Sequence, residues 1–203
     1  MFKPADKLTL ILGVETFDKD RQKAIQNNAV KMKAVIEALK TAGLSKEELQ
    51  TKDFVLIPQM TPQPKNPPAD WQPTIAGYQV RNTLIIKTVK LDSTGEFIDT
   101  VTKVGGNYIQ SISFSLLNDE EAKIEAIEKA YKQANTYAKA LAKTSGLQLG
   151  DIIELSISQP YMTTRSFKAE RLGVETETPI SPRDVEVSAS VSVIYKIETQ
   201  NKP

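Results

Sequence analysis

The acidic residues that follow Asn118 are the side chains whose type and spacing come closest to a chemical site. They lie within about three turns of an expected helix and comprise Asp119, Glu120, Glu121, Glu125 and Glu128. Two carboxylates held in a cleft could share general acid and base roles. Acidic residues in a first helical turn also stabilise the helix dipole, and Lys123, Lys129 and Lys132 stand three or four positions away as ion-pair partners. We therefore interpret this segment as the solvated start of a helix.

The chain contains no cysteine and no histidine. Without cysteine it has no thiolate nucleophile and no thiolate metal ligand. Without histidine it lacks the commonest general base and the commonest transition-metal ligand. The sequence also has no glycine-rich phosphate loop, nucleophile elbow or calcium-loop spacing. We predict no catalytic, cofactor-binding or metal-binding residues, and we expect that the protein is not an enzyme.

The charges of the chain are balanced. Lysine and arginine total 26, aspartate and glutamate total 25, and the net charge is +1 over 203 residues. This balance creates no long-range field that would attract a nucleic acid or an anionic membrane. No apolar run approaches the roughly 20 residues that a membrane-spanning helix needs. We expect one domain over residues 1–203, no nucleic-acid partner and no transmembrane segment.

The first part of the chain predicts a strand, a long helix and a short strand. Leu8, Leu10, Leu12 and Val14 recur at every second position, which is typical of a strand with one apolar face. Asp18 or Asp20 can cap a helix that runs to Ala42, with an inward stripe of Ile25, Ala29, Met32, Ile36 and Leu39. Residues 45–48 resemble a capping box that starts one more helical turn. A short strand over residues 54–57 ends at Pro58.

The second part predicts an alternation of strands and helices that ends in a long strand. The expected order is a strand over 78–86, a helix that a capping box at 93–96 opens, a strand over 108–116, a helix from Asn118 to about Ser145, a strand over 153–157 and a strand over 185–197. In the last strand, apolar residues alternate with glutamate, serine and lysine, and Ile194 is the exception. One face therefore meets helices and the other meets water. We predict an α+β fold, mainly an antiparallel sheet with long helices packed on one face.

Two segments carry no regular pattern. The first, residues 58–76, contains six prolines between Pro58 and Pro73 and the single tryptophan, Trp71. Proline lacks the backbone N–H, so we expect an extended arm there. Trp71 either packs on the body of the protein or marks a contact with another subunit. The second, residues 160–183, is expected to be an irregular loop, and a subunit-contact arm is the alternative.

The chain resembles the SIMPL-domain family, a family of unknown function. The resemblance covers most of the chain and rests on the order and spacing of several short patterns. These are Asn28-Ala29 with Met32 and Leu39, Gly77-Tyr78 with Asn82, Gly106-Asn107 with Ile112 and Phe114, the row Ala130, Ala134, Ala138 and Ala142, and the strand from Val187 to Tyr195. The glycines suit positions that need a positive φ or a close backbone approach. Asn82 and Asn107 can bond neighbouring backbone. The alanine row lies along one face of a helix and is expected to pack that helix closely on the sheet, with a partner helix as the alternative.

The resemblance implies an exported protein. Members of the family usually carry an export signal or a lipid anchor, and usually open with a further strand before a Pro-Asp pair. Here Pro4-Ala5-Asp6 is similar to that pair, and by this resemblance we expect the preceding strand and the signal to be missing from this sequence. A trimmed start explains both departures, so we expect a periplasmic or extracytoplasmic location.

These observations lead to three hypotheses. The first is a non-enzymatic binding or assembly protein of the cell envelope that works as a homo-oligomer, with a protein partner and no cofactor. Some of the family is linked in broad terms to oxidative-stress defence, which a chain without cysteine could not perform by thiol chemistry. The second is a small-ligand or hydrolytic enzyme that uses carboxylates in a cleft. The third is a signalling adaptor that acts through the proline-rich arm, where residues 64–67 fit the pattern PxxP.

Overall fold

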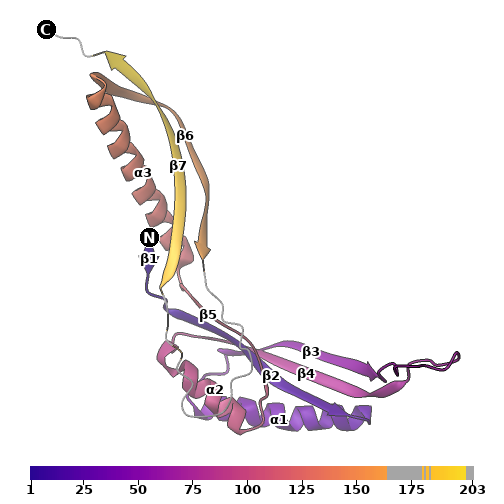
Figure 1. Ribbon diagram of the computed structural model, residues 1–203. Coiled ribbons are helices and arrows are strands. Elements are labelled where there is room, and N and C mark those ends of the chain that lie inside the picture. The colour runs from indigo at the N-terminus through magenta and orange to yellow at the C-terminus, as the bar shows by residue number, and fades with distance from the viewer. Residues whose placement is uncertain (164–179, 181, 183, 200–203) are drawn as a thin grey trace. The chain divides into compact units, whose positions relative to one another are not determined.

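The computed structural model describes residues 1–163, 180, 182 and 184–199 (Figure 1). By its contacts the described chain divides into two compact units. The three-stranded unit comprises residues 1–5, 115–163 and 184–199, and the four-stranded unit comprises residues 6–114 with residues 180 and 182. The predicted α+β fold with antiparallel strands is confirmed, although the strands form two sheets. That residues 1–203 act as one domain stays a prediction.

The four-stranded unit has the strand order β3-β4-β2-β5. Its strands are β2 (Lys7–Asp18), β3 (Leu49–Met60), β4 (Ile75–Thr88) and β5 (Tyr108–Ser115). β4 pairs antiparallel with both β2 and β3. The core contains the predicted alternating residues of β2, from Leu8 to Val14, opposite Leu84 and Ile86 of β4. The helix α1 (Arg21–Thr41) packs over β2 and β4, and α2 (Thr94–Lys103), which follows the single turn η1 (Leu91–Ser93), packs beside α1.

The helix α1 begins where the sequence predicts but turns a different side to the sheet. Asp20 is its N-cap, and its side chain accepts hydrogen bonds from the backbone N–H groups of Gln22 and Lys23. The predicted stripe is wrong by one position at three places, since the buried residues are Ala24, Asn28, Met32, Val35 and Leu39. Ala29 is exposed. The reason is Asn28, whose buried amide bonds to two strands of the sheet and thereby fixes the rotation of the helix.

Two local helix signals were only partly right. Residues 45–48 form a turn and not a helix, although the backbone N–H of Ser45 donates to Glu48 Oε2 at 2.8 Å, as one half of a capping box requires. Ser93 precedes α2 but makes no side-chain capping bond. The apolar residues predicted for α2 are placed correctly, because Phe97, Ile98 and Val101 are buried.

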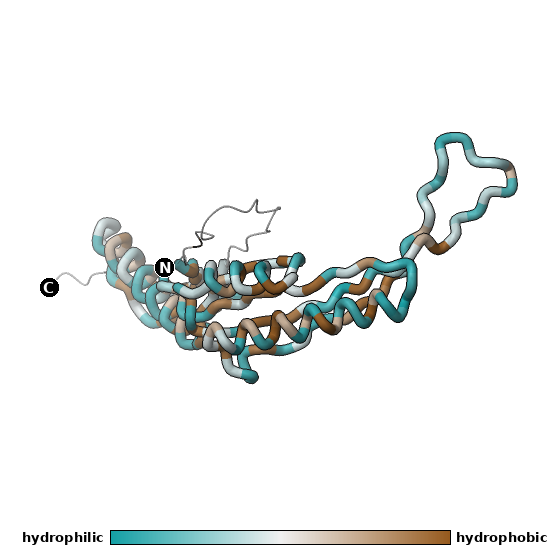
Figure 2. The backbone as a smooth tube through the Cα atoms, turned by 90° about the horizontal axis from the view of Figure 1, so that it is seen from below, coloured by the Kyte–Doolittle hydropathy of each residue, from teal (hydrophilic) through white to brown (hydrophobic). Residues whose placement is uncertain are grey.

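β3 is longer than the sequence predicts and continues through Pro58 to Met60. The prediction that Pro58 ends the strand is wrong because β3 lies at the edge of its sheet, where a missing N–H disturbs the ladder least. The proline-rich arm is therefore shorter than residues 58–76. It spans residues 61–74, is closed at its base by the backbone bond from Thr61 N to Thr74 O at 2.7 Å, and stands clear of the ends of β3 and β4 (Figure 2). Trp71 is half-buried and its backbone N–H donates to Pro68 O.

The three-stranded unit has the strand order β1-β7-β6, with all pairs antiparallel. β1 (Phe2–Lys3) is a short strand before Pro4, where the sequence predicts none, and it forms because it pairs with β7. β6 (Leu147–Thr163) and β7 (Val185–Thr199) are long, and α3 (Asp119–Thr144) packs against both of these long strands. In the predicted alanine row of α3, Ala142 is buried and Ala130, Ala134 and Ala138 are half-buried, and Ala122 and Ala126 extend the same row as buried residues. Its prediction as the face that meets the sheet is confirmed.

The predicted irregular loop at 160–183 is only partly described. Residues 160–163 belong to β6 and are a correction to that prediction. Residues 164–179, 181 and 183, which include Arg165, Lys168, Arg171 and Arg183, lie outside the described residues. Within the described part of the chain, no helix is both long and apolar enough to cross a membrane.

Candidate functional site

The acidic residues at the start of α3 are engaged in helix capping and ion pairs. Asn118 is the N-cap, as predicted, and its Oδ1 accepts from the backbone N–H of Glu121 at 3.2 Å. Lys123 Nζ lies 2.8 Å from Asp119 Oδ2, and Lys129 Nζ lies 2.8 Å from Glu125 Oε1. This arrangement is the solvated ion-pair face that the sequence predicts.

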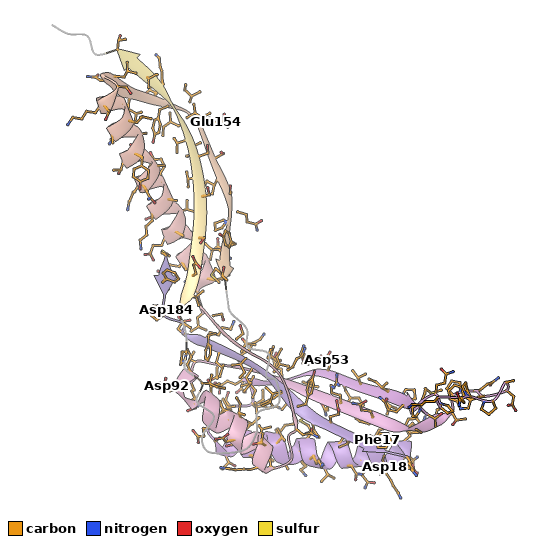
Figure 3. All side chains as sticks on the ribbon, viewed as in Figure 1. Phe17, Asp18, Asp53, Asp92, Glu154 and Asp184 are labelled. Carbon is orange, nitrogen blue, oxygen red and sulfur yellow. The ribbon has the colours of Figure 1, made fainter. Side chains whose placement is uncertain are left out.

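The carboxylates described by the structure do not gather elsewhere either. Within the four-stranded unit, Asp18, Asp53 and Asp92 lie apart on β2, β3 and η1 (Figure 3). Among the described residues there is no group of three or more aspartate or glutamate side chains that could hold a metal ion. The hypothesis of a carboxylate enzyme therefore gains no support from the placement of these residues.

Among the described acidic residues, Glu125 has the most strongly lowered pKa. The hydrogen bonds from Lys129 and then from Lys3, whose Nζ lies 2.5 Å from Glu125 Oε2, lower the pKa of Glu125 to about 2. The second of these bonds ties β1 to α3. The lowered pKa means that the folded protein stabilises the charged form of the Glu125 carboxylate. The contribution of Glu125 to the free energy of unfolding is therefore fully present above its ordinary pKa of 4.5 and is lost as the pH falls towards 2.

We expect Glu125→Gln to lower the urea midpoint slightly at pH 7 and to have a smaller effect near pH 2, where about half of the wild-type carboxylates are already protonated. The groups are exposed to solvent, so the effect at pH 7 is small and decreases with added salt. Urea unfolding of both proteins at pH 7 and near pH 2 checks this result. Glu128→Gln is the matched control, because Glu128 lies on the same helix and its Oε2 is 3.9 Å from Lys132 Nζ, the longest of the described ion pairs. An equal difference at both pH values would contradict the assignment.

A polar cluster of Glu15, Arg81, Tyr108 and Asn107 lies on the four-stranded sheet. Arg81 donates from Nε to Glu15 Oε2 at 2.8 Å, and its guanidinium carbon lies 4.5 Å from the centre of the Tyr108 ring. The bond to Glu15 raises the pKa of Arg81. Asn107 donates to Glu15 O and accepts from Glu15 N, so it fastens the chain before β5 to β2. The prediction that Asn107 bonds neighbouring backbone is confirmed.

Two of the glycines in the family patterns mark close approaches. A Cβ on Gly77 would lie 2.3 Å from the ring of Phe17, and a Cβ on Gly106 would lie 2.1 Å from Val101 Cγ1. Gly77 thus lets the Phe17 ring lie across β4, and Gly106 lets the chain leave α2 tightly. The predicted need for close approach is confirmed at both positions.

The least expected feature of the three-stranded unit is an apolar surface on β6 that α3 leaves open. Ile152, Leu155 and Ile157 oppose Tyr195, Val193 and Val191 of β7 and so share the face that α3 covers. Yet they are 43%, 52% and 51% exposed, whereas their partners on β7 are half-buried. α3 therefore covers β7 more fully than β6. We call Ile152, Leu155 and Ile157 the open strip of β6.

The other face of the same two strands is mainly polar, and exposed Ile194, opposite Glu154, is an exception. Ser156 opposes Ser192, and Ser158 opposes Ser190. Among the described residues, this unit has a small core cluster near the start of α3, formed by Leu116, Ala122, Ala126, Val185 and Val187. The open strip of β6 thus lies on the face of the sheet that packs against α3, but the described residues of this unit leave it about half exposed.

β3 of the four-stranded unit also exposes apolar side chains. Phe54, Val55 and Ile57 are 52%, 42% and 38% exposed. The sequence placed strands at both segments but gave no indication of exposure, because an uncovered apolar strand has the same alternation as a covered one. The exposed apolar strands, and not a catalytic constellation, are the features of this chain that require an explanation.

Comparison with known proteins places the chain in context. Residues 3–195 match the family described as SIMPL, protein of unknown function (DUF541). The chain is 29% identical over 202 residues to the 26 kDa periplasmic immunogenic protein of Brucella melitensis, which covers 95% of this chain and 79% of that protein. It is 22% identical over 197 residues to the uncharacterized protein YggE of Escherichia coli, with 95% of this chain and 78% of that protein covered.

Proposed function

This chain belongs to the SIMPL family of proteins of unknown function, and from this membership and its exposed apolar strands we propose that it is a non-enzymatic binding or assembly protein of the cell envelope that works as a homo-oligomer. The observation that carries the proposal is the open strip of β6. Large apolar patches on soluble proteins usually mark interaction sites. Here the patch lies on the side of the sheet that already packs a helix.

The open strip offers apolar surface that assembly would remove from water. Fully burying one leucine or isoleucine side chain contributes about 1.5–3 kcal/mol, so completing the burial of a half-exposed residue contributes about 1 kcal/mol. Ile152, Leu155 and Ile157 together would supply about 3 kcal/mol from each copy. Exposed Tyr137 and Leu141 of α3 and Ile153 of β6 could extend the contact.

The proposed location follows from the relatives. One relative that matches 95% of this chain is named a periplasmic protein. A chain without cysteine is compatible with the oxidising envelope, because it offers no thiol to mispair. Family membership is the sole support for a role in stress defence. The protein would perform such a role by binding a partner, since it has no thiol.

Light scattering of the purified chain over a hundredfold range of concentration tests the assembly. The proposal predicts a mass that is a multiple of 22.5 kDa and that falls on dilution. A strict monomer throughout the range would end the assembly part of the proposal. The location is tested separately by fractionating cells that express the natural gene, and recovery only with the cytoplasm would contradict it.

A further inference from the structure

β3 has a free edge within the described part of the chain. It is the outermost strand in the order β3-β4-β2-β5 and pairs with β4 alone (Figure 1). A free edge presents unpaired N–H and C=O groups that can add a further strand. Monomeric proteins usually protect such an edge with charges, prolines or bulges.

The protection on β3 is confined to its two flanks. A bulge with Lys52 and Asp53 precedes the segment 54–57, and Pro58 follows it. Between them lie Phe54, Val55, Leu56 and Ile57, an apolar run without any charge. The unprotected part of the edge is therefore short and sharply bounded.

The unprotected run is apolar on both faces of the sheet. Phe54 and Leu56 oppose Asn82 and Val80, so they lie on the side of α1, and Val55 and Ile57 oppose Arg81 and Gln79 on the other side. Strands that are apolar on both faces are typical of the interior of a sheet and not of its edge. β3 thus has the composition of an interior strand in an edge position.

We propose that the free edge of β3 pairs antiparallel with β3 of a second copy and joins two four-stranded sheets into one. This inference rests on the proposed self-assembly and names one of its contacts. A two-fold axis at Leu56 would place Val55 opposite Ile57 of the second copy and Phe54 opposite Pro58. Asp53 would face Gln59, so no like charges meet.

The self-complementarity of β3 favours a second copy over a foreign strand. Centring the pair on Leu56 keeps apolar residues opposite apolar residues on both faces. Moving the axis to Val55 would place Asp53 opposite Ile57 and lose that match. An axis placed midway between two residues would pair each residue with one that points to the opposite face of the sheet. The axis at Leu56 is therefore the register that the sequence specifies.

Cysteine cross-linking of the full chain tests this contact, because the wild type contains no cysteine. Directly opposed residues of antiparallel strands have Cα atoms about 4.5–5.5 Å apart, which suits a disulfide. We expect Leu56→Cys to form a disulfide-linked dimer under mild oxidation. An equal mixture of Val55→Cys and Ile57→Cys should give the mixed dimer in excess over either dimer of like chains.

Val30→Cys on α1 is the control, since Val30 is 66% exposed and lies on a helix, not on the edge strand. Adding Val55→Lys to Leu56→Cys should reduce the cross-linked fraction roughly tenfold, because the change enters the symmetric pair twice. If Leu56→Cys cross-links no faster than Val30→Cys while light scattering still detects the oligomer, the β3 contact is wrong and the assembly stands. If the chain is a strict monomer, the β3 contact and the proposed self-assembly are both wrong.

Discussion

Replacing Leu155 and Ile157 with lysine is expected to remove the assembly that depends on the open strip of β6. Both residues oppose valines of β7 and are about half exposed. The double substitution loses about 2 kcal/mol of apolar burial from each copy and requires two ammonium groups to leave water. Self-association through this surface should weaken at least about a hundredfold. Sedimentation velocity should then detect only monomers and dimers paired through β3.

Ser156→Lys with Ser158→Lys is the matched control for this experiment. These residues alternate with Leu155 and Ile157 on the same strand but lie on the polar face, opposite Ser192 and Ser190. The control adds the same charge to the same strand, so it should leave the mass of the assembly unchanged. Equal loss of assembly in both variants would show that charge, and not the open strip, is responsible.

Asn28→Ala is expected to lower the free energy of unfolding by about 2–3 kcal/mol, the largest single-site effect on stability that we predict. Asn28 is fully buried on α1, and its Nδ2 donates to Val14 O at 2.9 Å and to Val80 O at 3.2 Å. One amide thus connects α1 to both β2 and β4. Removing it leaves a small cavity beside two carbonyl oxygens.

Urea unfolding at pH 7 measures this change. Asn27→Ala is the control, because Asn27 is the exposed neighbour on the same helix and should change stability by less than about 0.5 kcal/mol. Asn28→Asp should be more harmful than Asn28→Ala at pH 7, since a buried carboxylate can only accept and would face two carbonyl oxygens. If Asn28→Ala is no more destabilising than Asn27→Ala, the amide does not anchor the helix.

Local patterns predicted most of the elements because their causes are local. The alternation from Leu8 to Val14 depends only on the pleat of one strand, and Asp20 and Asn118 cap their helices with bonds to residues two or three positions away. The family was also visible in the sequence, since the patterns that carry the resemblance lie within the matched residues 3–195.

The errors arose where a distant partner decides the outcome. The stripe of α1 was misplaced because a buried asparagine cannot be distinguished from a surface one without the carbonyls that it bonds. Pro58 was expected to end β3 because its position at an edge depends on which strands pair. The two sheets were expected as one for the same reason. The open strip of β6 was not predicted, because alternation gives the side of a residue and not the extent of its cover.

The central claim is that the open strip of β6 is an interface between copies of this chain. Hydrogen–deuterium exchange of peptides covering residues 150–160 tests this claim most directly. The exchange is measured at protein concentrations above and below the dissociation constant of the oligomer. The account predicts slower exchange of this segment in the assembled wild type and faster exchange on dilution and in the Leu155→Lys, Ile157→Lys variant. Equal exchange at all concentrations, with an oligomer still present, would contradict it.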